Sequence, residues 1–263
     1  MLRDLTLGQY YPVDSVIHRL DPRTKFLGTL MFIVSVFLFK TFWGFLLCGG
    51  FVIGVTILAR IPIKYILKGI RPILFLLLFM MIFNLLLTPG EVIGEWWIFK
   101  VTKEGIYAAL FMGLRLIMLV FGSSLMTYTT TPNKLTSGME SVFGFLKVIK
   151  VPVHELAMMI SIALRFIPIL LEETNKIMKA QQARGADFES GGVIKRAKAM
   201  VPILIPLFLS AFRRAGDLAE AMEARCYHGG AGRTKMKPLK YHLRDLFAYL
   251  ALIGLIVGAV FIP

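Results

Sequence analysis

Five stretches of the chain are runs of apolar residues bounded by charged or turn-forming residues, the pattern expected of membrane-crossing helices. They cover residues 26–39, 42–59, 73–87, 105–127 and 246–263. A crossing helix needs about 20 largely apolar residues, and flanking Lys and Arg side chains help a shorter run by reaching to the lipid headgroups. The pattern therefore predicts five transmembrane helices.

Two further apolar runs, at residues 156–171 and 199–212, are interrupted by Arg165 and Pro168 and by two prolines, respectively. If both crossed, the segment between them would be exported with six Lys and Arg residues. Short cytoplasmic loops, not external ones, collect such cations. Both runs are also shorter than a normal span. We expect them to dip into the cytoplasmic leaflet or lie along it.

Composition and charge agree with a membrane protein. The chain is 57% hydrophobic and 17% charged, against roughly 45–50% and 25% for a soluble protein. Its net charge is +14, and a cytoplasmic N-terminus leaves only Lys40, Lys100 and Lys103 outside. The expected fold class is an all-α, multi-pass protein of the cell membrane with its N-terminus inside and long helices along the inner leaflet.

The long segment between the fourth and fifth spans is helix-forming but too polar to dissolve in lipid. One helix is expected from Pro152 to near Gly185, and a second from near Val193 through Arg225. The predicted organisation has three parts: helices 1–4 in residues 1–130, a cytoplasmic or interfacial helical domain in residues 131–245, and a last span in residues 246–263.

The two long helices are expected to end alike. The sequences AQQARG (180–185) and AMEARC (221–226) share an Ala-x-x-Ala-Arg-small pattern, in which Arg184 and Arg225 occupy the same position. An arginine there suits the negative end of a helix dipole, which is sufficient to explain its position. Because the two helix ends carry the same pattern, with one arginine at each tip, they also suggest two matching partners.

At these residues the chain resembles the transmembrane T component of energy-coupling factor transporters, the vitamin and trace-metal importers of prokaryotes. The resemblance is carried by four stretches: LRFIP (164–168), MKAQQARGADF (178–188), PLFLSAFRR (206–214) and AMEARCYHGG (221–230). Two upstream stretches, LDPRTK (20–25) and TTP (130–132), are also similar to the family.

The resemblance implies a non-catalytic scaffold that couples ATP hydrolysis by two ATPase subunits, a homo- or heterodimer, to movement of a substrate-binding S component. ATP and Mg²⁺ would be held by the ATPases, and this chain would bind no cofactor. By position, the ATPase-docking residues would be Ala183, Arg184 and Gly185 at one tip and Ala224, Arg225 and Cys226 at the other. Cys226 departs from the family's usual Gly. In this family the S component selects the substrate, so the sequence of this chain does not identify the substrate.

Three residues, Arg115, Arg165 and Pro168, either belong to an S-component interface or are structural within the membrane, and one surface also allows two readings. Arg115, in the middle of a span, either acts at the S-component interface or makes a structural hydrogen bond to a neighbour such as Asn84. Arg165, close to Pro168, either reaches to the headgroups or pairs with Glu172 or Glu173. The Met-rich surface of residues 156–171 and 199–212 could face a moving S component, since Met repacks easily, or could face lipid.

Other classes of function are less consistent with the sequence. The four His residues form no metal-binding motif, and GGAGRTK (229–235) lacks the Gly-Lys-Ser/Thr ending of a phosphate loop. Membrane topology and anionic lipid account for the basic residues without nucleic acid. A stand-alone secondary transporter or channel is the alternative, although no inverted repeat is evident. An intramembrane enzyme ranks last, because no acidic pair or nucleophile–base set lies in a span.

Overall fold

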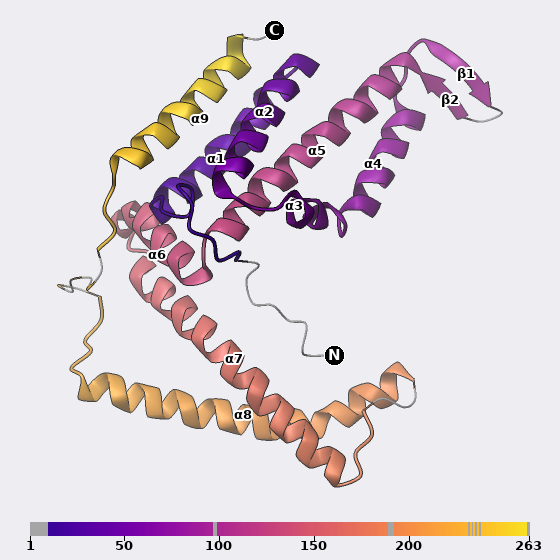
Figure 1. Ribbon diagram of the computed structural model, residues 1–263. Helices are drawn as coiled ribbons and strands as arrows, with labels where there is room; N and C mark the ends of the chain where they lie inside the picture. Colours follow the sequence, from indigo (N-terminus) through magenta and orange to yellow (C-terminus); the bar gives the residue numbers. More distant parts are fainter. Residues whose placement is uncertain are drawn as a thin grey trace. The chain divides into compact units, whose positions relative to one another are not determined.

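The computed structural model describes residues 10–96, 99–188, 192–230, 232, 234, 236 and 238–261 (Figure 1). Its described residues form two compact units. One, which we call the bundle unit, lies within Thr6–Val142 and Pro238–Pro263, and the other, the helix-pair unit, lies within Phe143–Lys237. Packing does not reveal the side of the membrane, so the division at residues 130/131 and 245/246 stays a prediction.

The bundle unit is helical except for one hairpin in its described part. Its helices are α1 (Pro22–Leu38), α2 (Phe42–Ala59), α3 (Ile63–Ile70), α4 (Leu74–Leu87), α5 (Lys103–Thr129), α6 (Pro132–Val142) and α9 (Leu243–Phe261). Strands β1 (Val92–Trp96) and β2 (Phe99–Thr102) pair antiparallel between α4 and α5. Helix α1 packs against α5, α6 and α9, and α5 also packs against α2, α3 and α4 (Figure 1).

The start of α1 is tied to the start of α9 by two buried carboxylates. The Asp21 side chain accepts from the Arg23 N–H at 2.9 Å, which caps the helix, and Pro22 fits the first turn because it needs no partner there. Asp245, only 2% exposed, accepts from the backbone N–H of Asp21 and of His242, each at 2.8 Å. These bonds fix the position where the two ends of the bundle unit meet.

An apolar core holds the bundle unit together. Its buried residues come from α1, α2, α5 and α9 and include Phe32, Val36, Cys48, Val52, Leu125 and Leu255. Cys48, expected to be buried in the second span, is completely buried on α2. Burying such side chains removes apolar surface from water or from contact with less well-packed lipid, and it holds the helices in one arrangement.

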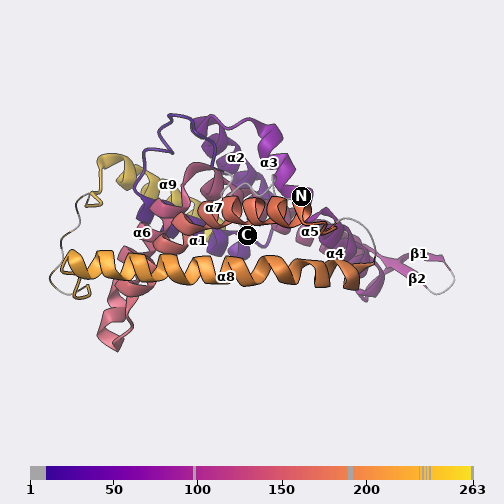
Figure 2. The same cartoon turned by 90° about the horizontal axis from the view of Figure 1, so that it is seen from below.

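The helix-pair unit consists of a short 3-10 helix, η1 (Phe143–Ile149), and two long helices, α7 (Val153–Ala183) and α8 (Val193–Ala224). The two helices have 31 and 32 residues, and Pro168, Pro202 and Pro206 lie inside them without ending them. Figure 2 shows α8 as one long, unbroken helix. The sequence prediction of two long helices from Pro152 and Val193 is confirmed. Among the described residues of this unit, only Val153, Ala157 and Ile203 are buried.

Five helices of the described chain are long and apolar enough to cross a membrane, which equals the number of spans expected from the sequence, although the two sets of five differ. They are α2, α5, α7, the Lys198–Ala224 part of α8, and α9. Helices α1 and α4 form where spans were predicted but have only 17 and 14 residues. The assumption that the 156–171 and 199–212 regions are too short to cross is wrong, because they belong to helices of 31 and 32 residues. The charge argument against crossing does not depend on length, so the topology stays a prediction.

Candidate functional site

The first candidate docking tip is the end of α7, where the chain closes in a Schellman motif. Arg184 is the cap residue, with φ −87° and ψ 7°. The Ala186 N–H donates to the Gln181 carbonyl at 3.0 Å, and the Gly185 N–H donates to the Gln182 carbonyl at 2.9 Å. This pair of bonds satisfies carbonyls that a helix end otherwise leaves without partners.

The second tip, at the end of α8, repeats this geometry residue for residue. Arg225 is the cap residue, with φ −94° and ψ 16°. The Tyr227 N–H donates to the Met222 carbonyl at 3.0 Å, and the Cys226 N–H donates to the Glu223 carbonyl at 2.8 Å. The sequence repeat therefore corresponds to a repeated structure, with one arginine at the same cap position of each helix.

The tips differ at the residue after the arginine. Gly185 has φ +89° and Cys226 has φ +54°. The left-handed region that tolerates a side chain is small, and the φ of Cys226 falls within it, so Cys226 fits its conformation. The φ of Gly185 lies beyond that region and needs glycine's freedom. This difference explains how position 226 can carry a side chain without loss of the cap.

Both tips present their side chains to the surroundings. Ala183, Arg184 and Gly185 are exposed, as are Ala224, Arg225 and Cys226. No side-chain hydrogen bond or ion pair to another described residue holds either guanidinium. A Cβ atom added at Gly185 would meet no other atom within 4 Å. Beyond the second tip, by contrast, the chain folds back and places Gly230 directly against His154 at the start of α7.

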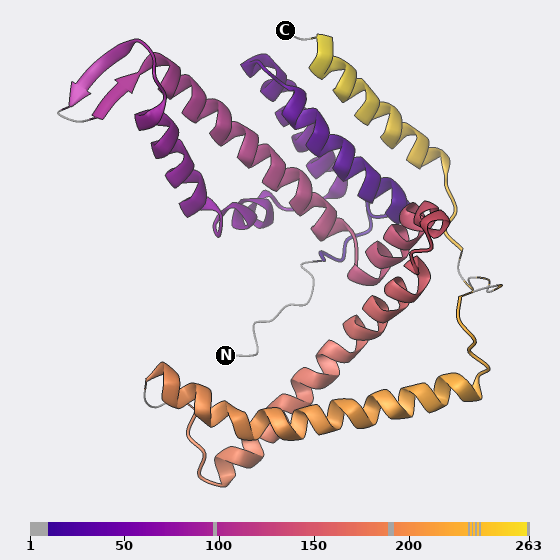
Figure 3. The same ribbon diagram turned by 180° about the vertical axis from the view of Figure 1, so that it is seen from behind.

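The two helices that carry the tips pack against each other and cross (Figures 1 and 3). An ion pair between Arg214 Nη2 on α8 and Glu173 Oε2 on α7, 3.5 Å apart, joins them. Both tips therefore belong to one packed element, in which the position of one helix constrains the other.

Arg115 on α5 has a partner inside the bundle unit. Its Nη2 donates to the Phe39 carbonyl at the end of α1, 3.1 Å away, and its guanidinium carbon lies 5.0 Å from the centre of the Phe111 ring. The expected neighbour, Asn84, instead donates to the Met80 carbonyl at 2.9 Å. Arg115 thus satisfies part of the α1 end, and a role at an S-component interface is a separate prediction.

Arg165 and Pro168 both lie on the exposed surface of α7. Within the described part of the chain, Arg165 makes no ion pair with Glu172 or Glu173, and Glu173 pairs with Arg214 instead. Pro168 leaves the helix with one N–H fewer but does not end it.

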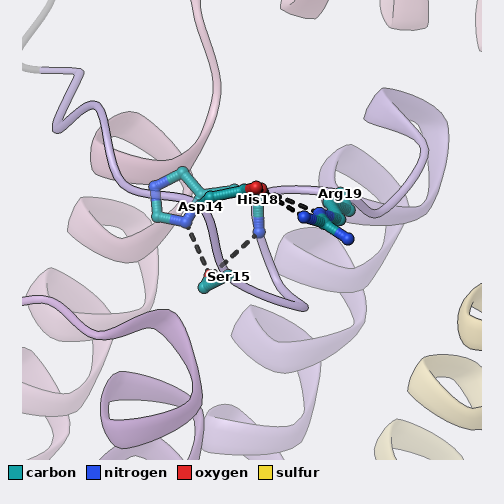
Figure 4. A network of polar contacts seen from close by, with 4 residues as sticks. All are labelled: Asp14, Ser15, His18 and Arg19. Carbon is teal, nitrogen blue, oxygen red and sulfur yellow. Dashed lines mark hydrogen bonds and ion pairs between the residues drawn. The ribbon is translucent and has the colours of Figure 1, made fainter.

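A polar network just before α1 was not anticipated from the sequence (Figure 4). Ser15 Oγ lies 2.7 Å from His18 Nδ1, and His18 Nε2 donates to the Tyr11 carbonyl at 3.0 Å, which makes Ser15 the donor to Nδ1. Arg19 pairs with Asp14. Burial, and next the charge of Lys25, lower the pKa of His18 from its ordinary value.

This Ser–His pair has a structural geometry. Ser15 is only 6% exposed, and the carboxylate beside it, Asp14, binds Arg19 and not the imidazole. A nucleophile needs an accessible hydroxyl and a base oriented by a third group. A Ser-x-x-His spacing ahead of a helix start was the signal that could have identified the network. Elsewhere in the described residues, no three His, Cys, Asp or Glu side chains gather as metal ligands.

The family model described as cobalt transport protein (CbiQ) matches residues 14–236. That match, together with the five long apolar helices, defines the class as a multi-pass membrane component of a transporter.

Individual relatives narrow the class. The energy-coupling factor transporter transmembrane protein EcfT of Ruminiclostridium cellulolyticum is 53% identical over 246 residues, covering 94% of this chain and 92% of the relative. EcfT of Acidaminococcus fermentans is 53% identical over 262 residues, covering 100% and 96%. EcfT of Bacillus subtilis is 48% identical over 256 residues, covering 97% of each. The chain belongs to the EcfT family of transmembrane components of energy-coupling factor transporters, which confirms the resemblance stated from the sequence.

Proposed function

We propose that this chain is the scaffold through which two ATPase subunits, identical or different, drive a membrane-embedded, substrate-binding S component. The observation that carries the proposal is the pair of Schellman-capped helix ends, each with an exposed arginine at the cap position, on two helices that pack together. One tip would dock on each ATPase. Family membership supports the proposal, since the relatives are named as parts of a multisubunit transporter.

Arginine is chemically suited to this docking. Its planar guanidinium is permanently charged and can form two parallel hydrogen bonds to a carboxylate or to backbone carbonyls of a partner. Because the cap fixes the backbone on both sides of Arg184 and of Arg225, closure of the ATPases would move the helices and not merely bend a loop.

The nucleotide would belong to the ATPases. Helix C-termini carry the negative end of the helix dipole, so neither tip favours a phosphate, which binds at helix N-termini. ATP and Mg²⁺ would therefore act on the partners, and this chain would catalyse no reaction and bind no cofactor itself. Its contribution would be mechanical, transmitting movement to the S component.

The test removes the two arginines together, by Arg184→Ala and Arg225→Ala in one chain. Co-expressed ATPases should then be lost on purification of the chain, and ATP-dependent uptake of a labelled vitamin should fall to background. The matched control is Lys179→Ala with Arg213→Ala, which removes one exposed cation from each of the same helices away from the tips. Undiminished assembly and uptake in the arginine double variant would contradict the proposal.

The proposal also requires both tips on the cytoplasmic side, with the N-terminus inside. Cys226 is exposed and Cys48 is buried, so a membrane-impermeant thiol reagent should label the chain in inside-out vesicles and leave it unlabelled in intact cells. Cys226→Ser should remove the signal. Labelling of Cys226 in intact cells would overturn this orientation.

A further inference from the structure

The ion pair that joins α7 and α8 lies at equivalent positions of the two repeated segments. Glu173 precedes Arg184 by the same number of positions as Arg214 precedes Arg225. The ion pair therefore joins matched positions of the two helices, because the sequence repeat relates Glu173 to Arg214 just as it relates the two tip arginines.

Equal residue counts give equal lever arms. At about 1.5 Å per helical residue, each arm from its ion-paired residue to its tip is about 16 Å long. Both arms end in the same cap, with bonds between the same relative positions. Two arms of one length with one type of end would suit a dimer of similar ATPase subunits with two similar docking sites.

Arg214 lies on the face of α8 that is partly buried, and its side chain pairs with α7. The partly or fully buried positions of the helix follow one narrow stripe, spaced three or four residues apart, which includes Ile203, Leu207, Ser210, Arg214 and Leu218. Its Nε is buried without a hydrogen-bond partner among the described atoms, so the carboxylate of Glu173 is the group that compensates its charge. The neighbouring charges Glu172 and Arg213 are exposed and lie off this contact.

We propose that Glu173 and Arg214 are positioning residues that set the register in which α7 and α8 pack, and so hold Arg184 and Arg225 at equal distances along their helices from the ion pair. This inference rests on the proposed function. A pair with side chains 26% and 40% exposed contributes little to stability. The role of the pair is to select one register of the two helices. Sliding one helix by a turn, about 5.4 Å, would separate the charges and make the arms unequal.

The test uses charge reversal and its repair. Glu173→Arg alone and Arg214→Glu alone each place two like charges at the crossing, whereas the double swap restores an opposite pair. We expect each single reversal to lower substrate transported per ATP hydrolysed by about fivefold, and the swap to return it to within about twofold of the unaltered chain. The ATPases should co-purify with all three variants, because the tips are unchanged.

Two matched controls isolate the crossing from charge in general. Glu172→Arg and Arg213→Glu make the same chemical changes one residue away, on exposed positions, and should leave transport per ATP unchanged. If the reversals fold poorly, Glu173→Gln and Arg214→Gln remove the charge without reversing it and should show a smaller loss of coupling. Their melting temperatures in detergent identify poor folding.

The arm geometry can be measured directly. Spin labels at Lys179 and Glu220, which are exposed and also related by the sequence repeat, report the separation of the arms in a Cys226→Ser background. The single reversals should broaden or shift this distance distribution, and the swap should restore it.

The outcomes separate this inference from the function on which it rests. Single reversals that match their controls, or a swap no better than either single, would overturn the positioning role while leaving docking at the tips intact. ATPases that co-purify without Arg184 and Arg225 would instead overturn the proposed docking, whatever the reversals do.

Discussion

The bundle unit and the helix-pair unit both expose apolar side chains, but they differ in how many of these side chains the chain itself buries. In the bundle unit, Phe32, Val36 and Cys48 are buried against neighbouring helices of the same chain. In the helix-pair unit, Met159 is 53% exposed and Phe208 is 63% exposed although both lie on long apolar helices. Exposed apolar surface on this scale indicates contact with lipid or with another protein.

This difference indicates that the packing of the bundle unit serves stability, whereas the surface of the helix-pair unit serves contacts with other molecules. The bundle unit carries its own core, so changes there should act first on stability. The helix-pair unit packs mainly along one seam and ends in two solvent-facing caps, so changes there should act first on assembly and transport. Variants in each unit can test this separation.

The largest effect is expected from reversing the charge at either tip. Arg184→Glu and Arg225→Glu should each lower uptake by at least about tenfold, because each loses two charge-assisted bonds and adds repulsion toward an acidic partner. The melting temperature should fall only slightly, because neither side chain has a partner among the described residues and the only cost is a glutamate at the negative end of the helix dipole. Lys179→Glu is the control for charge on α7. If the tip variants lost as much stability as variants in the core of the bundle unit, the separation between the two units would be contradicted.

The next effect belongs to the bundle unit. Asp245→Ala leaves the buried N–H of Asp21 without its acceptor, at about 1–3 kcal/mol, and also removes the acceptor of the His242 N–H, which belongs to an exposed residue. The melting temperature should fall by several degrees, measured by thermal unfolding in detergent. Asp245→Asn keeps one oxygen acceptor, so its melting temperature should fall less. If Asp245→Ala melts like the unaltered chain, the two carboxylate bonds do not fix the bundle.

Exchanging the residues after the two arginines sharpens the comparison within the helix-pair unit. Gly185→Cys places a side chain at φ +89° and should destabilise the α7 cap by about 1 kcal/mol, whereas Cys226→Gly removes a smaller strain and should stabilise the α8 cap. Amide hydrogen exchange at Ala186 and Tyr227 reports each cap. Faster exchange at Tyr227 in Cys226→Gly would contradict this interpretation of the φ angles.

The smallest effect is a pH dependence that arises in the bundle unit. The pKa of His18 is lowered in the folded chain from its ordinary value of 6.5, so the unfolded chain binds the proton more readily. Its contribution to stability is full above pH 6.5 and is lost as the pH falls below it. Thermal unfolding at neutral and at mildly acidic pH should show this slope, and His18→Asn should reduce it. An unchanged slope in the variant would assign the pH dependence to other groups.

Local signals in the sequence predicted the site better than the packing around it. The ends of α7 and α8 followed from an Ala-Arg-small pattern whose cap depends only on neighbouring residues. The 3-10 helix η1, the β1–β2 hairpin and the short helix α3 were not anticipated, because their segments lack the long periodic runs that identify a helix.

Contacts between distant residues could not be read from the sequence in the same way. Arg115 was expected to need a partner, but that partner is the Phe39 carbonyl, on a different helix far away in the sequence. Glu173 was considered as a partner for Arg165 on its own helix, and it binds Arg214 on the next. In both cases the fold, and not the spacing, decides which of several polar groups is near.

The Schellman bonds have a consequence for repeated cycles of transport. Because the backbone N–H groups of Ala186 and Tyr227 already satisfy the carbonyls of Gln181 and Met222, neither helix end needs a partner to keep its shape. A subunit that lets go leaves behind a preorganised end, which loses little conformational entropy when it is bound again. Release and rebinding are then possible without refolding.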